Sequence, residues 1–312
     1  MSDTDDLVNG VVRLTLVEGL MGCGKSFLCN ELVRRSPSID TCSRPVLFCV
    51  EEDINADLLT LFYNNPERYA FLIQLTTLER RTNAVNLRIQ HQNICRLQLD
   101  DKPRRDRIGV LDRSLLGDFV FALANYVMGR IDDHEMQVYC HKAGATHVTQ
   151  IAHAIDIAYG PETPWRILYL HSPAADCKNR VDTIRQTVEA DIVSLSYYQL
   201  LEQIYFNVIR ELRGSRPNAV TVVTWNQYSD ADKIRHHVCH KSSAGQRCKD
   251  VPTCASRCDD PPPRTSRAEP SQDVNTSRMR KFGLEWFDHT HIDHTMRHWA
   301  RHSLCSVKTN NA

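Results

Sequence analysis

The stretch LTLVEGLMGCGKSFLCNELVRR, residues 14–35, decides the fold of this chain. A β-branched, apolar segment at 11–17 predicts a buried strand, and the spacing of Leu28, Leu32 and Val33 predicts a helix after it. The loop between them, residues 19–26, fits the pattern G-x-x-x-x-G-K-S. Glycines in such a loop let backbone N–H groups turn inward around phosphates, and the amino end of the following helix adds its dipole. We therefore interpret the segment as a phosphate-binding loop rather than a glycine-rich turn without a ligand.

The residues of this loop are the predicted contacts of a nucleotide. Lys25 is expected to reach the β- and γ-phosphates, and the hydroxyl of Ser26 to ligate Mg²⁺. ATP and Mg²⁺ are therefore the expected cofactors. The full set of predicted phosphate-binding residues in the loop is Gly19, Leu20, Met21, Gly22, Cys23, Gly24, Lys25 and Ser26.

Composition narrows the class of protein. The chain has 312 residues, enough for one large α/β domain with an appendage. Lysine plus arginine equals aspartate plus glutamate, 38 each, so no overall charge favours nucleic acid or membrane binding. The chain lacks an apolar run long enough to span a membrane, and residues 1–10 do not resemble a signal peptide. Twelve cysteines scattered through apolar segments favour reduced thiols in a cytoplasmic protein, with a nuclear or mitochondrial location left open.

Short apolar strands alternate with helical segments along most of the chain. This alternation predicts an α/β fold with a five-stranded parallel sheet and helices on both faces. The loop then lies at the carboxyl end of the first strand, where open α/β sheets bind ligands. Further strands are expected at 44–50, 108–111, 165–170 and 218–225, and helices at 55–63, 66–99, 115–129, 133–158, 173–187 and 195–212.

Composition changes near residue 240, where large apolar residues become rare and proline, serine and arginine frequent. We expect a flexible N-terminus at 1–10, an α/β domain with the phosphate-binding loop at 11–240, a disordered linker at 241–280 and a tail at 281–312 with a short helix. Cysteine and histidine cluster at 236–258, and histidine at 289–302. The first cluster lacks a C-x₂-C pair, so a disordered tail is favoured over a zinc site there. For the second cluster, a solvated face or a partner-binding helix is favoured over a metal site.

Two strand ends carry charged residues suited to phosphoryl transfer. The third strand ends in Asp112-Arg113, where a carboxylate can hold metal and a guanidinium can balance phosphoryl charge. The second strand ends in Glu51-Glu52, and either carboxylate could accept a proton from a substrate hydroxyl. For each glutamate, a solvated loop charge is the alternative.

Several segments, in the same order, resemble the deoxyribonucleoside kinases. LLTLFYNNPERYAFLIQ (58–74) is similar to that family's Leu-Leu and Asn-Pro-x-Arg motifs and the glutamine that follows them. LDRS (111–114) and YVMG (126–129) resemble herpesvirus-type thymidine kinases. LYLHSPAADCKNRV (168–181) and LSYYQLLEQIY (195–205) resemble the lid region and the helix after it. The resemblance covers about residues 11–235, and it implies a P-loop kinase fold with an arginine-bearing lid.

The resemblance implies a role for many of these residues. Glu51 or Glu52 would take the proton from the nucleoside 5′-hydroxyl, and Arg113 would contact the transferred phosphoryl group. Mg²⁺ would be held by Ser26 with Asp112. The other implied contacts are Tyr63 and Glu189 to the sugar 3′-hydroxyl, Gln74 to the base edge, Phe121 stacked on the base, Arg81 paired with Asp118 beside the base, and Arg180 and Arg185 from the lid to the phosphates.

We therefore hypothesise a salvage enzyme that phosphorylates the 5′-hydroxyl of thymidine or deoxycytidine, and by extension purine deoxynucleosides, with ATP. By resemblance it would be a homodimer, and in the host-cell cytoplasm if the chain is viral. A nucleoside monophosphate kinase is the first rival, since Arg68, Arg80 and Arg81 could hold an acceptor phosphate. A non-catalytic nucleotide-binding module that acts through the tail at 240–312 is the second.

Overall fold

The computed structural model describes residues 12–34, 45–97, 106–185 and 193–225, together with Ile234 and Val238. The expected N-terminal segment 1–10, the linker at 241–280, the tail at 281–312 and both cysteine and histidine clusters lie outside this described part.

The described strands form one five-stranded parallel sheet, as the sequence predicts. The first strand lies at the centre of the order β2-β3-β1-β4-β5, and it is buried on both faces. In register, Val17 of this strand pairs with Asp112 on one side and Leu168 on the other, so three strands end at the same edge. The strands are β1 (Val12–Glu18), β2 (Val46–Val50), β3 (Arg107–Asp112), β4 (Trp165–His171) and β5 (Val220–Thr224).

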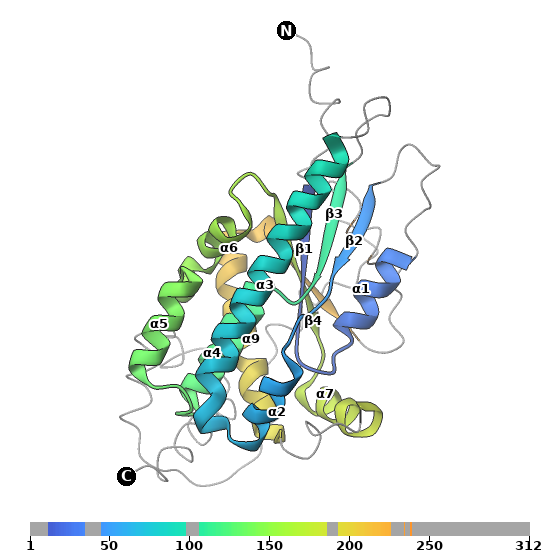
Figure 1. The fold of residues 1–312 in the computed structure, drawn as a ribbon. Helices are drawn as coiled ribbons and strands as arrows, with labels where there is room; N and C mark the ends of the chain where they lie inside the picture. Colours follow the sequence, from blue (N-terminus) through green and yellow to red (C-terminus); the bar gives the residue numbers. More distant parts are fainter. Residues whose placement is uncertain are drawn as a thin grey trace.

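Helices cover both faces of the sheet. The helices α3, α4, α5 and α6 gather on one side and α1 lies on the other (Figure 1). No helix in the described ranges is both long and apolar enough to cross a membrane. The helices are α1 (Lys25–Arg34), α2 (Ala56–Asn64), α3 (Pro66–Leu97), α4 (Leu115–Val127), α5 (Asp133–Ala143), α6 (Ile151–Tyr159), α7 (Ala174–Arg180) and α9 (Leu195–Ser215), with short turns η2 (Val148–Gln150), η3 (Val181–Arg185) and η4 (Pro217–Ala219).

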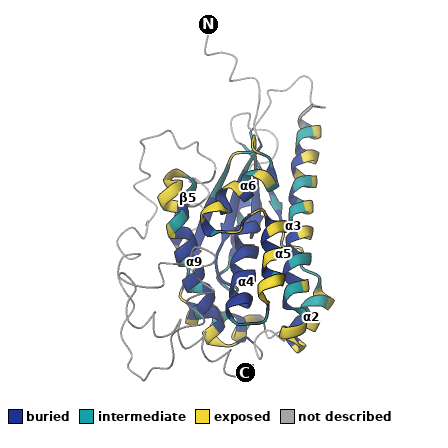
Figure 2. Cartoon of the chain, turned by 90° about the vertical axis from the view of Figure 1, so that its left-hand side faces the viewer, coloured by how far each residue is buried: buried dark blue, intermediate teal, exposed yellow. Residues whose placement is uncertain are grey.

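Helix α4 is the centre of the helical layer. All of its residues except Phe121 are buried, and it packs against α3, α5 and α9, as its uniformly dark ribbon in Figure 2 shows. Its first turn is fixed by Ser114, whose hydroxyl accepts a hydrogen bond from the backbone N–H of Leu116. Because α4 starts immediately after β3, the residues at this junction are held at the carboxyl edge of the sheet.

The prediction of a single helix at 133–158 is wrong, because the structure has two helices there, α5 and α6. A capping box between Asp132 and Glu135 starts α5, and Gly144 ends it with a left-handed φ of 71°. The chain then passes through η2 before α6 begins. The helix expected at 173–187 is likewise shorter, since α7 ends at Arg180 and continues as the π-helical turn η3.

Candidate active site

The loop after β1 has the backbone of a phosphate-binding loop. Its glycines have positive φ, 151° at Gly19, 72° at Gly22 and 99° at Gly24, which other residues rarely adopt. At Gly22 a Cβ would lie 2.7 Å from the carbonyl oxygen of Cys177, so α7 packs directly on the loop. The side chain of Lys25 is buried and its Nζ donates to the carbonyl oxygen of Leu20 at 2.9 Å, which holds the ammonium group inside the curve of the loop.

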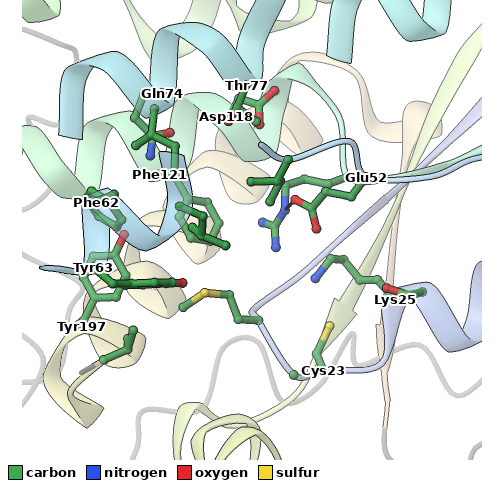
Figure 3. Close-up of a pocket in the computed structure, with 18 of the residues that line it drawn as sticks. Cys23, Lys25, Glu52, Phe62, Tyr63, Gln74, Thr77, Asp118, Phe121 and Tyr197 are labelled. Atoms are coloured by element: carbon green, nitrogen blue, oxygen red, sulfur yellow. Dashed lines mark hydrogen bonds and ion pairs between the residues drawn. The ribbon is translucent and has the colours of Figure 1, made fainter. Parts of the chain in front are cut away.

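A cavity of about 560 Å³ opens beside this loop, a volume typical of small-molecule sites. Lys25 and Glu52 lie on one side of it and Tyr63 and Tyr197 on the other, with Phe121 between them (Figure 3). The predicted site residues that line the cavity are Met21, Gly22, Cys23, Gly24, Lys25, Ser26, Glu52, Tyr63, Gln74, Arg113, Asp118, Phe121 and Arg180.

The remaining predicted residues fall elsewhere. Arg81 and Asp112 are buried behind the cavity wall, and Gly19 and Leu20 form the start of the loop without lining the cavity. Glu51 is exposed and does not line the cavity, so of the two glutamates the fold brings only Glu52 to the site. Glu189 and the side chain of Arg185 lie outside the described residues.

Two arginines share the carboxylate of Glu52. Its Oε1 accepts from Nε of Arg113 at 2.9 Å and from Nη2 of Arg81 at 3.1 Å. Arg81 also donates from Nε to Oδ2 of Asp118 at 2.7 Å, with both side chains almost fully buried. Burial works to raise the pKa of Glu52, but Arg113, Arg81 and Lys25 outweigh it and hold the pKa at about 2. The carboxylate of Glu52 is therefore ionised at neutral pH.

The side chain of Arg113 is fixed from several directions. Its backbone has a left-handed φ of 73°, and its N–H donates to the carbonyl oxygen of Val17 at 3.0 Å. The guanidinium carbon lies 4.4 Å from the centre of the Phe121 ring, within cation–π range. Nη1 donates to the hydroxyl of Tyr205 at 2.8 Å. A strained backbone held by this many contacts is typical of a functional residue.

Sequence reasoning missed Tyr205 and Glu18. The contact between Arg113 and Tyr205 joins residues 92 positions apart, and the segment 195–205 quoted for the resemblance contains Tyr205 without indicating this contact. A signal for Glu18 was present, because a carboxylate follows the apolar residues Leu16 and Val17 immediately before the glycine loop.

The wall opposite the loop combines aromatic rings with one amide. Gln74 on α3 is buried and lines the cavity with Tyr63 of α2. Phe121 meets Tyr197 of α9 edge to face, with ring centres 6.5 Å apart. Tyr197 was also missed as a wall residue, although it lies in a segment quoted for the resemblance. Such a wall suits a flat heterocycle that also needs hydrogen bonds at its edge.

Oxygen ligands suited to Mg²⁺ lie at the sheet edge. Asp112 is buried, and its Oδ1 has no hydrogen-bond partner among the described residues. The side chain of Ser26 is exposed at the cavity. The part of the chain that the structure describes holds no cluster of three His, Cys, Asp or Glu. Mg²⁺ binds through one or two protein oxygens together with substrate phosphates, and Asp112 and Ser26 offer such oxygens.

A parallel sheet with a glycine loop at the end of its central strand defines a P-loop nucleotide-binding protein, and the arginines around the cavity suit phosphoryl transfer. A family model described as deoxynucleoside kinase matches residues 15–243, so the chain belongs to the deoxynucleoside kinase family. It is 22% identical over 236 residues to a deoxyguanosine kinase of Dictyostelium discoideum, covering 76% of this chain and 72% of that one. It is 26% identical over 218 residues to a deoxyadenosine kinase of the same organism, covering 70% and 74%.

Among solved structures, the deoxyadenosine kinase from M. mycoides with bound dCTP aligns with 72% of this chain and 97% of its own, at 16% identity and a TM-score of 0.49. The family assignment confirms the resemblance and identifies the protein as a kinase of deoxynucleosides. The domain limits, the homodimer and the cytoplasmic location stay predictions.

Proposed function

We propose that this protein transfers the γ-phosphoryl group of ATP to the 5′-hydroxyl of deoxynucleosides whose base carries an exocyclic amine. The single observation that carries the proposal is the layout of the cavity. A phosphate-binding loop with Lys25 lies on one side, aromatic and amide groups lie on the other, and Glu52 and Arg113 stand beside the loop.

In this proposal the loop and Lys25 hold the β- and γ-phosphates, and Arg180 of α7, which packs on the loop, adds a guanidinium to them. The 5′-hydroxyl oxygen attacks the γ-phosphorus, the bond to the β-phosphate oxygen breaks, and ADP leaves. Glu52 accepts a hydrogen bond from the hydroxyl and then its proton. A carboxylate with a pKa of about 2 is a weak base, so orientation of the nucleophile is its larger contribution.

Arg113 balances the charge of the transferred group. Its Nε and Nη1 are bonded to Glu52 and Tyr205, and no described residue accepts a hydrogen bond from Nη2. That donor is available to a phosphoryl oxygen as charge spreads over it in the transition state. Asp112 and Ser26 would hold Mg²⁺, which when bound neutralises phosphate charge.

The choice of base follows from Asp118 and Gln74. Arg81 binds one oxygen of Asp118, and the same carboxylate lines the cavity. A carboxylate accepts hydrogen bonds only, so it favours the amine of cytosine, adenine or guanine over the carbonyl groups of thymine. Gln74 offers a donor and an acceptor together. The names of the relatives, deoxyguanosine and deoxyadenosine kinases, support the same preference.

A nucleoside monophosphate kinase is less well supported. Arg80 is paired with Asp53 at the surface, and Arg81 is committed to Asp118 and Glu52. Arg68 lies over the ring of Tyr69. Among the described residues that line the cavity, none of these three arginines appears.

The test is transfer of labelled phosphate from ATP with Mg²⁺ to each of the four deoxynucleosides and their monophosphates. We expect label on deoxycytidine, deoxyadenosine or deoxyguanosine, and at least about tenfold lower kcat/KM for thymidine, the usual cost of a mismatched polar group. Thymidine as the preferred acceptor would contradict the role of Asp118, and labelling of monophosphates alone would favour the rival kinase. The Lys25→Ala variant should lose transfer while its far-ultraviolet circular dichroism is unchanged.

A further inference from the structure

Glu18 is a fully buried carboxylate that the proposed reaction does not use. It is the last residue of β1, and Ser114 donates to its Oε1 twice, from the backbone N–H at 2.8 Å and from the hydroxyl at 2.6 Å. The N–H of Gly117 adds a third bond to Oε1 at 3.3 Å, and the hydroxyl of Tyr205 donates to Oε2 at 3.0 Å. Every one of these partners is a donor, which suits an ionised carboxylate.

Tyr205 connects this carboxylate to Arg113. Its hydroxyl donates to Glu18 and at the same time accepts from Nη1 of Arg113 at 2.8 Å. The ring of Tyr205 is fully buried and lies 5.5 Å from the ring of Tyr169, so neighbouring side chains fix its position. Burial raises the pKa of Glu18, and the nearby positive charge of Arg113 opposes that rise.

The same carboxylate fixes the backbone on the far side of Arg113. Through Ser114 and Gly117 it holds the first turn of α4, which directly follows Arg113. The packing is tight, because a Cβ at Gly117 would lie 2.7 Å from Oε2 of Glu18 and 2.4 Å from Cγ of Arg113. Glu18, at the start of the phosphate-binding loop, therefore helps to hold both the backbone and the guanidinium of Arg113.

We propose that Glu18 and Tyr205 are positioning residues that orient the guanidinium of Arg113 toward the transferred phosphoryl group. This inference rests on the role of Arg113 in the proposed function. The bond from Nε to Glu52 alone would leave the guanidinium free to pivot, and the bond from Nη1 to Tyr205 fixes its plane. With Nε and Nη1 both bonded, the direction of Nη2 is fixed before the reaction, so the guanidinium does not need to reorganise during transfer.

The first test compares Tyr205→Phe and Glu18→Gln with the wild type in steady-state kinetics. We expect each variant to lower kcat about tenfold and to leave KM for ATP and for the nucleoside within about twofold, since the lost interaction matters in the transition state. Tyr139→Phe is the matched control, because Tyr139 is also fully buried and its hydroxyl has no hydrogen-bond partner among the described residues. Wild-type kcat in both Tyr205→Phe and Glu18→Gln would overturn the proposal.

A double-mutant cycle separates positioning from general stabilisation. In an Arg113→Ala background, adding Tyr205→Phe should change kcat by less than about twofold, because its effect passes through the missing arginine. An equal loss from Tyr205→Phe with and without Arg113 would refute the positioning role.

A second readout does not need turnover. In arginine-labelled protein, NMR should find that the guanidinium protons of Arg113 exchange with water at least about tenfold faster in Glu18→Gln than in the wild type, while Tyr139→Phe leaves them unchanged. Unchanged exchange would count against the proposal even if Tyr205→Phe did not fold. A wild-type protein that transfers no phosphate to any deoxynucleoside would instead defeat the proposed function, and the exchange measurement would still decide whether Glu18 fixes Arg113.

Discussion

Replacing Glu52 by glutamine should affect folding stability and catalysis together. Glutamine keeps the size of the side chain and an oxygen that can accept hydrogen bonds, but it removes the charge shared by Arg81 and Arg113. It therefore imitates the protonated form of Glu52. The difference between the two proteins should equal the contribution of the ionised carboxylate.

The size of that contribution follows from the pKa. The interaction with the arginines lowers the pKa of Glu52 from 4.5 to about 2. At 1.36 kcal/mol for each pKa unit, the ionised group adds about 3 kcal/mol to the free energy of unfolding at pH 7. Because the folded pKa lies below the unfolded one, this contribution is complete above pH 4.5 and declines as pH falls toward 2. Linkage gives about 1.5 kcal/mol at pH 3.

Urea unfolding followed by tryptophan fluorescence measures this difference. We expect Glu52→Gln to be less stable than the wild type by about 3 kcal/mol at pH 7, with the gap narrowing below pH 4.5. The matched control is Glu51→Gln, since Glu51 is the exposed neighbour outside the cavity. In the kinase assay kcat of Glu52→Gln should fall by about 10², as for loss of a residue that orients the nucleophile and accepts its proton, and Glu51→Gln should behave as wild type.

Two results would refute this reasoning. A stability gap that stays the same from pH 7 to pH 3 would mean that the charge of Glu52 does not stabilise the fold. A loss of turnover in Glu51→Gln with normal turnover in Glu52→Gln would show that Glu51, and not Glu52, is the base.

Three further predictions address the base, the packing and the metal. Gln74→Ala should reduce the differences in kcat/KM among the deoxynucleosides, and this effect should be larger than its effect on KM for ATP. A uniform loss of kcat/KM for all bases would contradict the place of Gln74 at the base edge. Gly117→Ala should lower the free energy of unfolding by about 1–3 kcal/mol in urea melts, because the added Cβ would overlap Arg113. Gly214→Ala, whose Cβ would have nothing within 4 Å, should raise the free energy of unfolding by about 0.5–1 kcal/mol. Asp112→Asn should weaken Mn²⁺ binding to the ATP complex at least about tenfold by electron paramagnetic resonance, and unchanged binding would exclude Asp112 from the metal site.

The sequence alone determined the sheet and the position of the phosphate-binding loop. Apolar strands and helical spacing are local patterns, and a glycine loop between a strand and a helix has few alternative structures. Local pattern also predicted the long helix that carries Gln74 and Arg81, which lie seven residues, or about two turns, apart on α3. It failed at residues 133–158, where continuous helical spacing hid the helix end that Gly144 imposes.

The tertiary structure decided which charged residues meet. Sequence could not choose between Glu51 and Glu52, because adjacent side chains in an extended chain point to opposite sides and only packing determines which side faces the cavity. It could not reveal that Glu18 and Tyr205 are linked to Arg113. The contacts that join them, Arg113 to Tyr205 across 92 residues and Ser114 to Glu18 across 96, depend on how the strands and helices are ordered in space. Strand order placed these groups around one buried site, where low solvent exposure makes each hydrogen bond and charge pair stronger than it would be on the surface.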